Sequence, residues 1–518
     1  MHMVNSCYVI IGITEIVIMI IKGADFMDRK FSGLEELLKN RVFRNFANIS
    51  AIPRASFEEK QISDYLYKWA VDHKLEVIQD KNNNIFIRKA ASLGYENAPT
   101  VLLQAHMDMV CVKTADSNHD FSKDPINLVL DGDMLSSGGK TTLGADDGIG
   151  MAYALAVLEA EDLPHPALEV LFTTSEEEDM GGALNFDASL LKAKYLINLD
   201  HAVENELLSG SCGGTGVKLF WQHSVVDVPA DYASFNISIR GLKGGHSGED
   251  IHRGHGNANV LLGRFLTECR DSFPMLLSEI KGGTFRLAIP SYADVTLSLP
   301  SCYIDRLTQK AKSLEKIFAR EYAATAPNLT ITVSQTEQHK TALSPEDFDK
   351  ITTAIMLSPN GISEMNGGVP GTVESSDNMG EIYLADGHTV FVYEVRASFV
   401  STQEYLVRKI SLLAELLGAK YETFSGYPGW AFNPKSPLRE TAQRVFREKF
   451  SEDMVVTVLH AGLEVGCFIS GKEDLDAISI GPNCWYFHSP SECTSVSSVC
   501  KTWEFLCALL AEGNDLPK

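Results

Sequence analysis

The stretch VLLQAHMDM (residues 101–109) joins an apolar run directly to a histidine and an aspartate. An apolar run of this length, rich in Val and Leu, predicts a strand that is buried on both faces of a sheet. In open parallel sheets, ligands bind beyond the carboxyl ends of the strands. We therefore expect His106 and Asp108 at such an edge, on the same face because they are two residues apart.

Two further segments also join an apolar run to acidic residues. ALEVLFTTSEEE (167–178) ends in Glu176 and Glu177, and KYLINLDHA (194–202) ends in Asp200. Three strands that bring carboxylates and a histidine to one sheet edge predict a cation site. Without a cation, such charges would repel one another, and some would have to take up protons.

Each motif alone also has an ordinary interpretation. Asp146 and Asp147 precede an Ala-rich helix, where aspartate commonly caps the first turn. The glutamates could form a solvated turn, and His488 in CWYFHSP could be an ordinary loop histidine. The conjunction of five carboxylates with two histidines favours two divalent metals. Oxygen and nitrogen ligands without cysteine suit zinc, manganese or cobalt, and zinc is the usual choice for hydrolysis.

Composition narrows the class of protein. A chain of 518 residues predicts two or three domains. Its formal net charge of −23 argues against nucleic-acid binding, which needs basic patches. The ten cysteines form no C-x-x-C pair and indicate free thiols of a cytoplasmic protein.

The N-terminus carries an apolar run at residues 8–21 that contains Glu15 and is too short to span a bilayer. We interpret residues 1–29 as an extension, with a natural start at Met27 as a second interpretation. Deletion of residues 1–26 is expected to leave activity intact. A membrane-bound form that uses residues 8–21 is the alternative, and cell fractionation would distinguish it.

The order of predicted elements indicates an α/β protein with an inserted domain. We expect a mostly parallel-sheet catalytic domain with helices on both faces, interrupted by an α+β lid domain. The expected boundaries are 30–213 and 428–518 for the catalytic domain and 214–427 for the inserted lid and dimerisation domain. Expected helices span 33–50, 56–74, 144–161, 307–323, 401–417 and 494–512, and expected strands span 76–90 (a hairpin), 231–242, 284–299, 328–336, 388–398, 454–462 and 475–482.

The ordered set of motifs resembles the M20 clan of co-catalytic zinc peptidases, and within it the aminoacyl-histidine (Xaa-His) dipeptidase family. The resemblance runs from about residue 30 to residue 515. The matching blocks are LQAHMDMV, HDFSKDPI, TTLGADDGIGMAYALAVL, SEEEDMGGA, LINLD, GLKGGHSGEDIHRGHGNAN, YPGW, HAGLEVGCF and SIGP followed by HSPSE.

The resemblance implies five metal ligands for two Zn²⁺ ions, which Co²⁺ or Mn²⁺ could replace. His106 and Asp200 would hold one ion, Glu177 and His488 the other, and Asp146 would bridge them. A water molecule between the metals would then attack the peptide bond.

The resemblance also implies roles for residues that hold no metal. Asp108 would orient His106, and Glu176 would be the general base. His246 would contact substrate and support the oxyanion after domain closure, and Arg396 and Glu464 are further candidates for substrate contacts.

The expected activity is hydrolysis of unblocked dipeptides, Xaa-His among them, by a homodimer in the cytoplasm without nucleic-acid or membrane partners. The alternatives are an N-acyl amino-acid deacylase of the same clan and a non-catalytic metal-binding protein. HAVENEL after Asp200, Asp147 in place of an expected Asn, and the bulky CWYF before His488 depart from the family pattern and leave the preferred dipeptide open.

Overall fold

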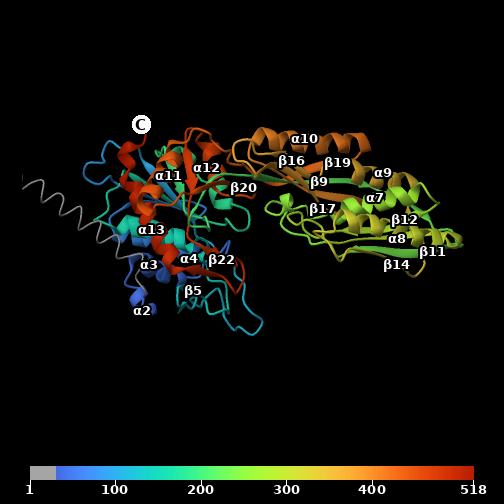
Figure 1. Ribbon diagram of the computed structural model, residues 1–518, viewed down its shortest axis with the longest axis horizontal. Helices are drawn as coiled ribbons and strands as arrows, with labels where there is room; N and C mark the ends of the chain where they lie inside the picture. Colours follow the sequence, from blue (N-terminus) through green and yellow to red (C-terminus); the bar gives the residue numbers. More distant parts are fainter. Residues whose placement is uncertain (1–30) are drawn as a thin grey trace, which may run out of the picture. The chain divides into compact units, whose positions relative to one another are not determined.

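The computed structural model describes residues 31–518, so the predicted extension 1–29 and its apolar run lie outside the described residues. From residue 31 onward, no helix is both long and apolar enough to cross a bilayer. The described chain divides into two compact units (Figure 1). The first unit contains the described residues up to Ser209 together with Asn433–Thr457 and Cys467–Lys518. The second contains Gly210–Phe432 and also Val458–Gly466, a segment that we expected in the catalytic domain.

The first unit is built on an eight-stranded sheet. Its four central strands β6, β3, β7 and β21 run parallel to one another, and antiparallel neighbours flank them. The sheet is therefore mostly parallel at its centre, where strands buried on both faces are expected. In spatial order the strands are β1 (Glu76–Gln79), β2 (Ile85–Lys89), β6 (Leu168–Thr173), β3 (Val101–His106), β7 (Tyr195–Asn198), β21 (Asp476–Ser479), β8 (Glu206–Ser211) and β20 (Val455–Leu459).

Helices from both ends of the chain pack with this sheet in one hydrophobic core. The central helix, α5 (Ala145–Glu159), contacts β3 and has 13 buried residues, as its Ala-rich apolar sequence predicts. A small four-stranded sheet carries the loop that leads to His488. The other helices are α2 (Leu34–Leu37), α3 (Arg41–Ser50), α4 (Lys60–Asp72), α6 (Gly181–Leu184), α11 (Pro437–Phe450), α12 (Val465–Gly471) and α13 (Val496–Ala511), and the small sheet has the order β22 (Cys484–Trp485), β23 (Cys493–Ser495), β5 (Met134–Ser136) and β4 (Val129–Asp131).

The prediction of one helix over residues 33–50 was wrong. The chain forms the short α2 and then the separate α3, with Asn40 between them in an extended conformation. The Asn40 side chain accepts a hydrogen bond from the amide of Val42 at 2.8 Å. Because this bond is a helix cap, it starts a new helix where apolar periodicity alone indicated continuity.

The second unit is an antiparallel sheet covered by four helices. Its strands share one core with α7 (Ala258–Arg270), α8 (Ile304–Glu321), α9 (Pro345–Leu357) and α10 (Val400–Leu417). A separate two-stranded sheet pairs β10 (Val225–Asp227) with β15 (Thr341–Leu343). The main sheet has the order β14 (Thr330–Gln335), β11 (Tyr232–Arg240), β13 (Ala293–Pro300), β12 (Leu276–Gly282), β17 (Val373–Ala385), β18 (His388–Ala397), β9 (Gly213–Gln222) and β19 (Lys420–Tyr427), with β16 (Gly361–Met365) paired to β17.

The prediction of one strand over residues 284–299 was also wrong. The strand β13 begins only at Ala293, and β12 ends at Gly282, so residues 283–292 form a loop. Gly283 has a φ of 66°, in the left-handed region that favours glycine, and Pro290 lacks an amide to donate to a ladder. These two residues explain why the alternating sequence between them does not extend the strand.

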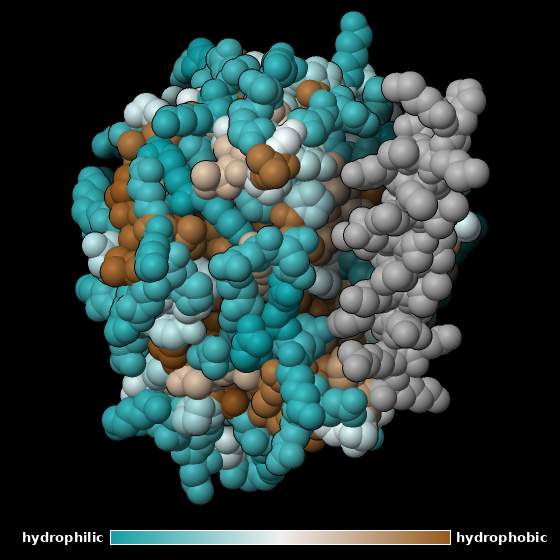
Figure 2. All heavy atoms as spheres, turned by 90° about the vertical axis from the view of Figure 1, so that its left-hand side faces the viewer, coloured by the Kyte–Doolittle hydropathy of each residue, from teal (hydrophilic) through white to brown (hydrophobic). Residues whose placement is uncertain are grey.

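Figure 2 shows the surface of the first unit from the side that lies to the left in Figure 1. Hydrophilic side chains dominate its coloured part, and hydrophobic side chains form smaller areas between them. A chain with 22% charged residues is expected to expose such a mixed surface.

Candidate metal centre

His106 stands at the end of β3 with 1% of its side chain exposed. Its Nδ1 lies 3.4 Å from Oδ1 of Asp108, and its Nε2 lies 3.0 Å from Oδ1 of Asp146. A carboxylate at one ring nitrogen fixes the orientation of an imidazole and leaves the other nitrogen for a ligand. The geometry therefore gives Asp108 an orienting position and turns Nε2 of His106 toward the other acids.

Asp108 also fixes the turn after β6. Its two oxygens accept hydrogen bonds from the amides of Glu176 at 3.0 Å and Glu177 at 3.2 Å, and from the Ser56 hydroxyl at 2.8 Å. Because a single buried carboxylate holds both the His106 ring and the Glu176–Glu177 backbone, two of the three strand ends are set relative to each other.

Asp146 lies between the two histidines. One of its oxygens is 3.0 Å from Nε2 of His106, and the other is 3.6 Å from Nε2 of His488. Glu177 lies 3.0 Å from His488, and Asp200 lies 3.7 Å from His106. All five predicted ligands thus meet within the first unit, although they come from three strand ends, a helix start and a C-terminal loop.

Asp147, the neighbour of Asp146 across a cis peptide bond, has a different environment. It accepts hydrogen bonds from the amides of His106 at 3.3 Å and Gly150 at 3.1 Å. The bond to Gly150 is a capping bond at the start of the regular part of α5. One acid of the pair therefore caps the helix, while the other faces the histidines.

The pKa values of several groups in the cluster are shifted toward the binding of protons. Burial and the nearby Asp146 carboxylate raise the pKa of Asp200 well above its usual value, and the same two causes raise the pKa of Glu177. Hydrogen bonds that His488 donates to the carboxylates of Asp146 and Glu177 raise its pKa to about 10. Protons thus offset part of the negative charge of the cluster. A divalent metal that binds there would displace these protons.

The donor set fits divalent metal ions of the zinc type. Three groups each place their ligand atoms within 4.8 Å of one another, namely His106 with Asp147 and Asp200, His106 with Glu176 and Glu177, and Asp146 with Glu177 and His488. The second and third groups share Glu177, and the first two share His106. Imidazole and carboxylate without thiolate are the ligands of hydrolytic zinc, cobalt and manganese sites.

Three buried charged residues that sequence reasoning missed support this cluster. Glu492 accepts hydrogen bonds from the loop before Asp146, Arg54 donates to that loop and to the end of β3, and Glu59 accepts from the amide and hydroxyl of Ser175. Glu492 lies in the block HSPSE, four residues after His488, which was the only sequence signal for any of them. Their partners are mostly backbone groups, so residue patterns do not reveal them.

The predicted substrate residues His246, Arg396 and Glu464 lie in the second unit. The Arg396 guanidinium is buried, 3.5 Å from Nε2 of His246, 3.4 Å from the Ser247 hydroxyl and 3.1 Å from the Tyr427 hydroxyl. Burial, reinforced by Arg396, lowers the pKa of His246 to about 4. The amide of Glu249 donates to Nδ1 of His246 at 3.1 Å. Glu464 is buried in the same unit.

A further histidine of the second unit, His460, also escaped prediction. Its Nδ1 lies 2.8 Å from the Cys212 thiol and its Nε2 lies 2.7 Å from the Ser376 hydroxyl. Burial lowers the pKa of His460 to about 3, with Arg396 as the next cause. His460 is therefore a neutral histidine with a hydrogen-bond partner at each ring nitrogen, and it does not titrate near neutral pH.

Comparisons with known proteins agree with this architecture. The chain is 37% identical over 481 residues to the cytosol non-specific dipeptidase of Escherichia coli (strain K12), covering 93% of this chain and 99% of that protein. The crystal structure of aminoacylhistidine dipeptidase from Vibrio alginolyticus superposes with a TM-score of 0.85 at 34% identity, covering 92% of this chain and 97% of that one. Aminopeptidase PepT from Bacillus cereus ATCC 10987, at 16% identity and a TM-score of 0.52 with 91% and 98% of the two chains covered, shares the fold.

The family model described as Peptidase family M20/M25/M40 matches residues 102–512. The matched range begins in β3, the strand that carries His106, and ends just after α13, so it contains every residue of the acidic cluster. The chain therefore belongs to the M20/M25/M40 peptidase family.

Proposed function

We propose that this protein is a metal-dependent dipeptidase that hydrolyses the peptide bond of unblocked dipeptides with the help of two divalent cations, zinc by default. The observation that carries the proposal is the position of Asp146, 3.0 Å from one histidine and 3.6 Å from the other. A carboxylate between two imidazoles is the arrangement expected of a ligand shared by two metals.

In this proposal His106 and Asp200 would hold one ion, Glu177 and His488 would hold the other, and Asp146 would be shared between them. The chemistry that such ions supply is polarisation of the scissile carbonyl and a lowered pKa of water at the site. Glu176 takes a proton from the attacking water and passes it to the departing amine. Asp108 keeps Glu176 in place through its amide and keeps the His106 ring in place through Nδ1.

The substrate side of the proposal rests on the relatives. One relative is named a non-specific dipeptidase and the other an aminoacylhistidine dipeptidase, so we infer dipeptides as substrates, Xaa-His among them. His246 is proposed as a group that contacts the substrate carbonyl, and Arg396 and Glu464 as further substrate contacts. We also propose a cytoplasmic location, which the name of the Escherichia coli relative supports.

The test is a substrate panel combined with metal analysis on one preparation. Xaa-His dipeptides, other dipeptides and N-acetyl amino acids are assayed side by side before and after dialysis against a chelator, and again after zinc is returned. Dipeptide hydrolysis that disappears with the metal and returns with zinc supports the proposal. Preferential hydrolysis of N-acetyl amino acids would identify a deacylase, and metal binding without hydrolysis of any of these compounds would identify a non-catalytic protein.

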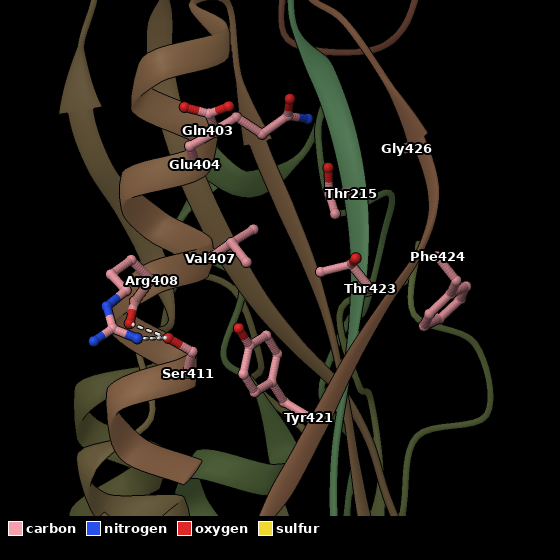
Figure 3. A pocket seen from close by; sticks show the side chains of 10 residues that line it. All are labelled: Thr215, Gln403, Glu404, Val407, Arg408, Ser411, Tyr421, Thr423, Phe424 and Gly426. Carbon is pink, nitrogen blue, oxygen red and sulfur yellow. Dashed lines mark hydrogen bonds between the residues drawn. The ribbon is translucent and has the colours of Figure 1, made fainter. Parts of the chain in front are cut away.

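We further propose that the protein forms a homodimer through β19 and α10. The strand β19 is the last strand of its sheet, and every residue from Lys420 to Gly426 is exposed. A long exposed edge strand offers unpaired backbone groups to another chain. A cavity of about 450 Å³ lies between α10 and β19. Figure 3 shows that Tyr421 and Val407 point into the space between this helix and this strand.

A second copy suits this edge better than an unrelated strand. In an antiparallel pairing centred on Tyr421, Lys420 stands opposite Glu422 of the second copy, and the reverse pair forms by symmetry. The neighbouring helix α10 exposes Leu412 and Leu416, which are 48% and 72% accessible. The molar mass in solution tests this, because Leu416→Asp is expected to convert a dimer into a monomer. A wild-type protein that is monomeric would contradict the proposal.

A further inference from the structure

The loop that carries Asp146 is held from both sides by buried charges of opposite sign. On one side the Glu492 carboxylate accepts hydrogen bonds from the amides of Leu143 at 2.9 Å, Gly144 at 3.1 Å and Ala145 at 2.8 Å, with the Asp146 amide at 3.5 Å. Glu492 is 2% exposed, so these amides stand in for the water that the carboxylate has lost.

On the other side the Arg54 guanidinium donates to the backbone. It bonds the carbonyl of Gly144, and also the carbonyls of Met107 at 3.0 Å and Asp108 at 2.8 Å. Arg54 is as buried as Glu492. Gly144 is therefore bound at its amide by the Glu492 carboxylate and at its carbonyl by the Arg54 guanidinium.

Glu492 also acts on the charge of Arg54. Burial lowers the pKa of Arg54, and Glu492 is the carboxylate that most opposes this effect.

The two residues connect distant parts of the chain. Arg54 precedes α4 and joins the end of β3, which carries His106 and Asp108, to the loop before Asp146. Glu492 lies four residues after His488 and joins the C-terminal loop to the same segment. The segments that carry His106, Asp146 and His488 are thus connected through Gly144.

We propose that Arg54 and Glu492 form a clamp on Gly144 that positions Asp146 between His106 and His488 and thereby sets the affinity of the site for metal. The inference rests on the proposed function, because it presumes that these residues hold metal. Arg54 and Glu492 are positioning residues, since their hydrogen bonds go to the backbone of the ligand-bearing segments.

The test is zinc binding by the full chain, measured after dialysis by titration against a chelating indicator. Glu492→Gln places an amide NH₂ group against backbone donors and removes the charge opposite Arg54. Loss of a residue that orients metal ligands typically weakens metal binding by about 10–100-fold. We expect a loss in that range for Glu492→Gln and for Arg54→Met, and addition of excess zinc should restore dipeptide hydrolysis.

Glu169→Gln is the matched control. Glu169 is also a buried glutamate whose carboxylate accepts backbone hydrogen bonds, from the amides of Lys192 at 3.0 Å and Ala193 at 2.9 Å. It lies near the start of β6, whereas the metal cluster lies beyond the end of that strand. Glu169→Gln is therefore expected to lower stability while it binds zinc as the wild type does.

Three results would overturn the clamp. They are a folded Glu492→Gln variant that binds zinc as tightly as the wild type, an equal loss of zinc affinity in Glu169→Gln, and a weakened variant whose hydrolysis excess zinc does not restore. If Glu492→Gln does not fold, Glu492→Asp keeps the negative charge and withdraws the carboxylate from the amides, and unchanged zinc affinity in that variant overturns the clamp equally. A wild-type chain that binds no zinc would instead contradict the proposed function, so the two failures are distinct.

Discussion

Glu177 and His488 are 311 positions apart in the chain, yet their side chains approach to 3.0 Å. The adjacent residue Glu176 belongs to the same turn and is held through its own amide by Asp108 at 3.0 Å. The turn after β6 therefore presents two consecutive carboxylates, and that of Glu177 contacts His488.

Replacement of these two glutamates should have different consequences. Glu177→Ala removes a proposed ligand and is expected to lower the zinc content of the purified protein. Glu176→Ala is expected to keep its zinc and to lower kcat by about 10²–10⁴-fold, the usual contribution of a positioned general base. Metal analysis and steady-state kinetics on both variants check this, and equal metal loss in the two would contradict the division of roles.

Gly144 is expected to tolerate no side chain. Its φ of 69° lies in the left-handed region, and a Cβ there would stand 2.4 Å from a guanidinium nitrogen of Arg54 and 2.8 Å from the Met109 sulfur. Gly144→Ala should therefore lower both the thermal midpoint and the zinc affinity. Gly139→Ala is the control, because its φ of 74° gives similar backbone strain while a Cβ would meet no atom within 4 Å. Equal zinc affinity in the two variants would show that the contact with Arg54 does not matter.

The buried histidines of the second unit should make the protein less stable in acid. The pKa of His460 is lowered by burial to about 3, below its ordinary value of 6.5. As the pH falls below 6.5 the unfolded chain takes up a proton at His460 that the folded chain does not, so stability is lost until the pH reaches the folded pKa. His460→Gln lacks this linkage. The difference in thermal midpoint between wild type and variant should shrink from pH 7.5 to pH 4.5, and a constant difference would contradict the prediction.

Arg396 should keep His246 neutral. Burial and the Arg396 cation lower the pKa of His246 to about 4, whereas Asp250 opposes them. Arg396→Met removes the cation and is expected to raise the pKa of His246 toward 6.5. An NMR titration of the imidazole signals, assigned with His246→Gln, measures this shift. An unchanged His246 pKa in Arg396→Met would mean that burial alone keeps the ring neutral.

The ligand edge of the first unit could be predicted from sequence because its central strands are mainly apolar and are followed directly by acids or by a histidine. A mainly apolar run such as Val101–Ala105 is expected inside a sheet, so His106 and Asp108 after it are expected at the sheet edge. The convergence of the three strands then follows from the parallel order β6, β3, β7. His488 was a candidate before any resemblance was considered, but its role as a ligand came only from the resemblance, because nothing local distinguishes it from other loop histidines.

The supporting residues could not be predicted in this way. Glu492 and Arg54 act on backbone amides and carbonyls, and every residue has these groups, so no pattern of side chains indicates the contact. The predictions of one strand over residues 284–299 and of one helix over residues 33–50 failed for a related reason. Both depend on local backbone conformation and capping, which outweigh the periodicity of apolar residues.

The insertion of the second unit has a consequence for the order in which the protein is made. Consider a chain on the ribosome that has been synthesised through Asp200. It already contains His106, Asp146 and Glu177, but it lacks both His488 and Glu492, the residue that binds the Gly144 amide. Synthesis must pass through the whole second unit before the last histidine is added. A nascent or prematurely terminated chain therefore lacks the full set of proposed ligands, so peptidase activity is expected only when translation is nearly finished.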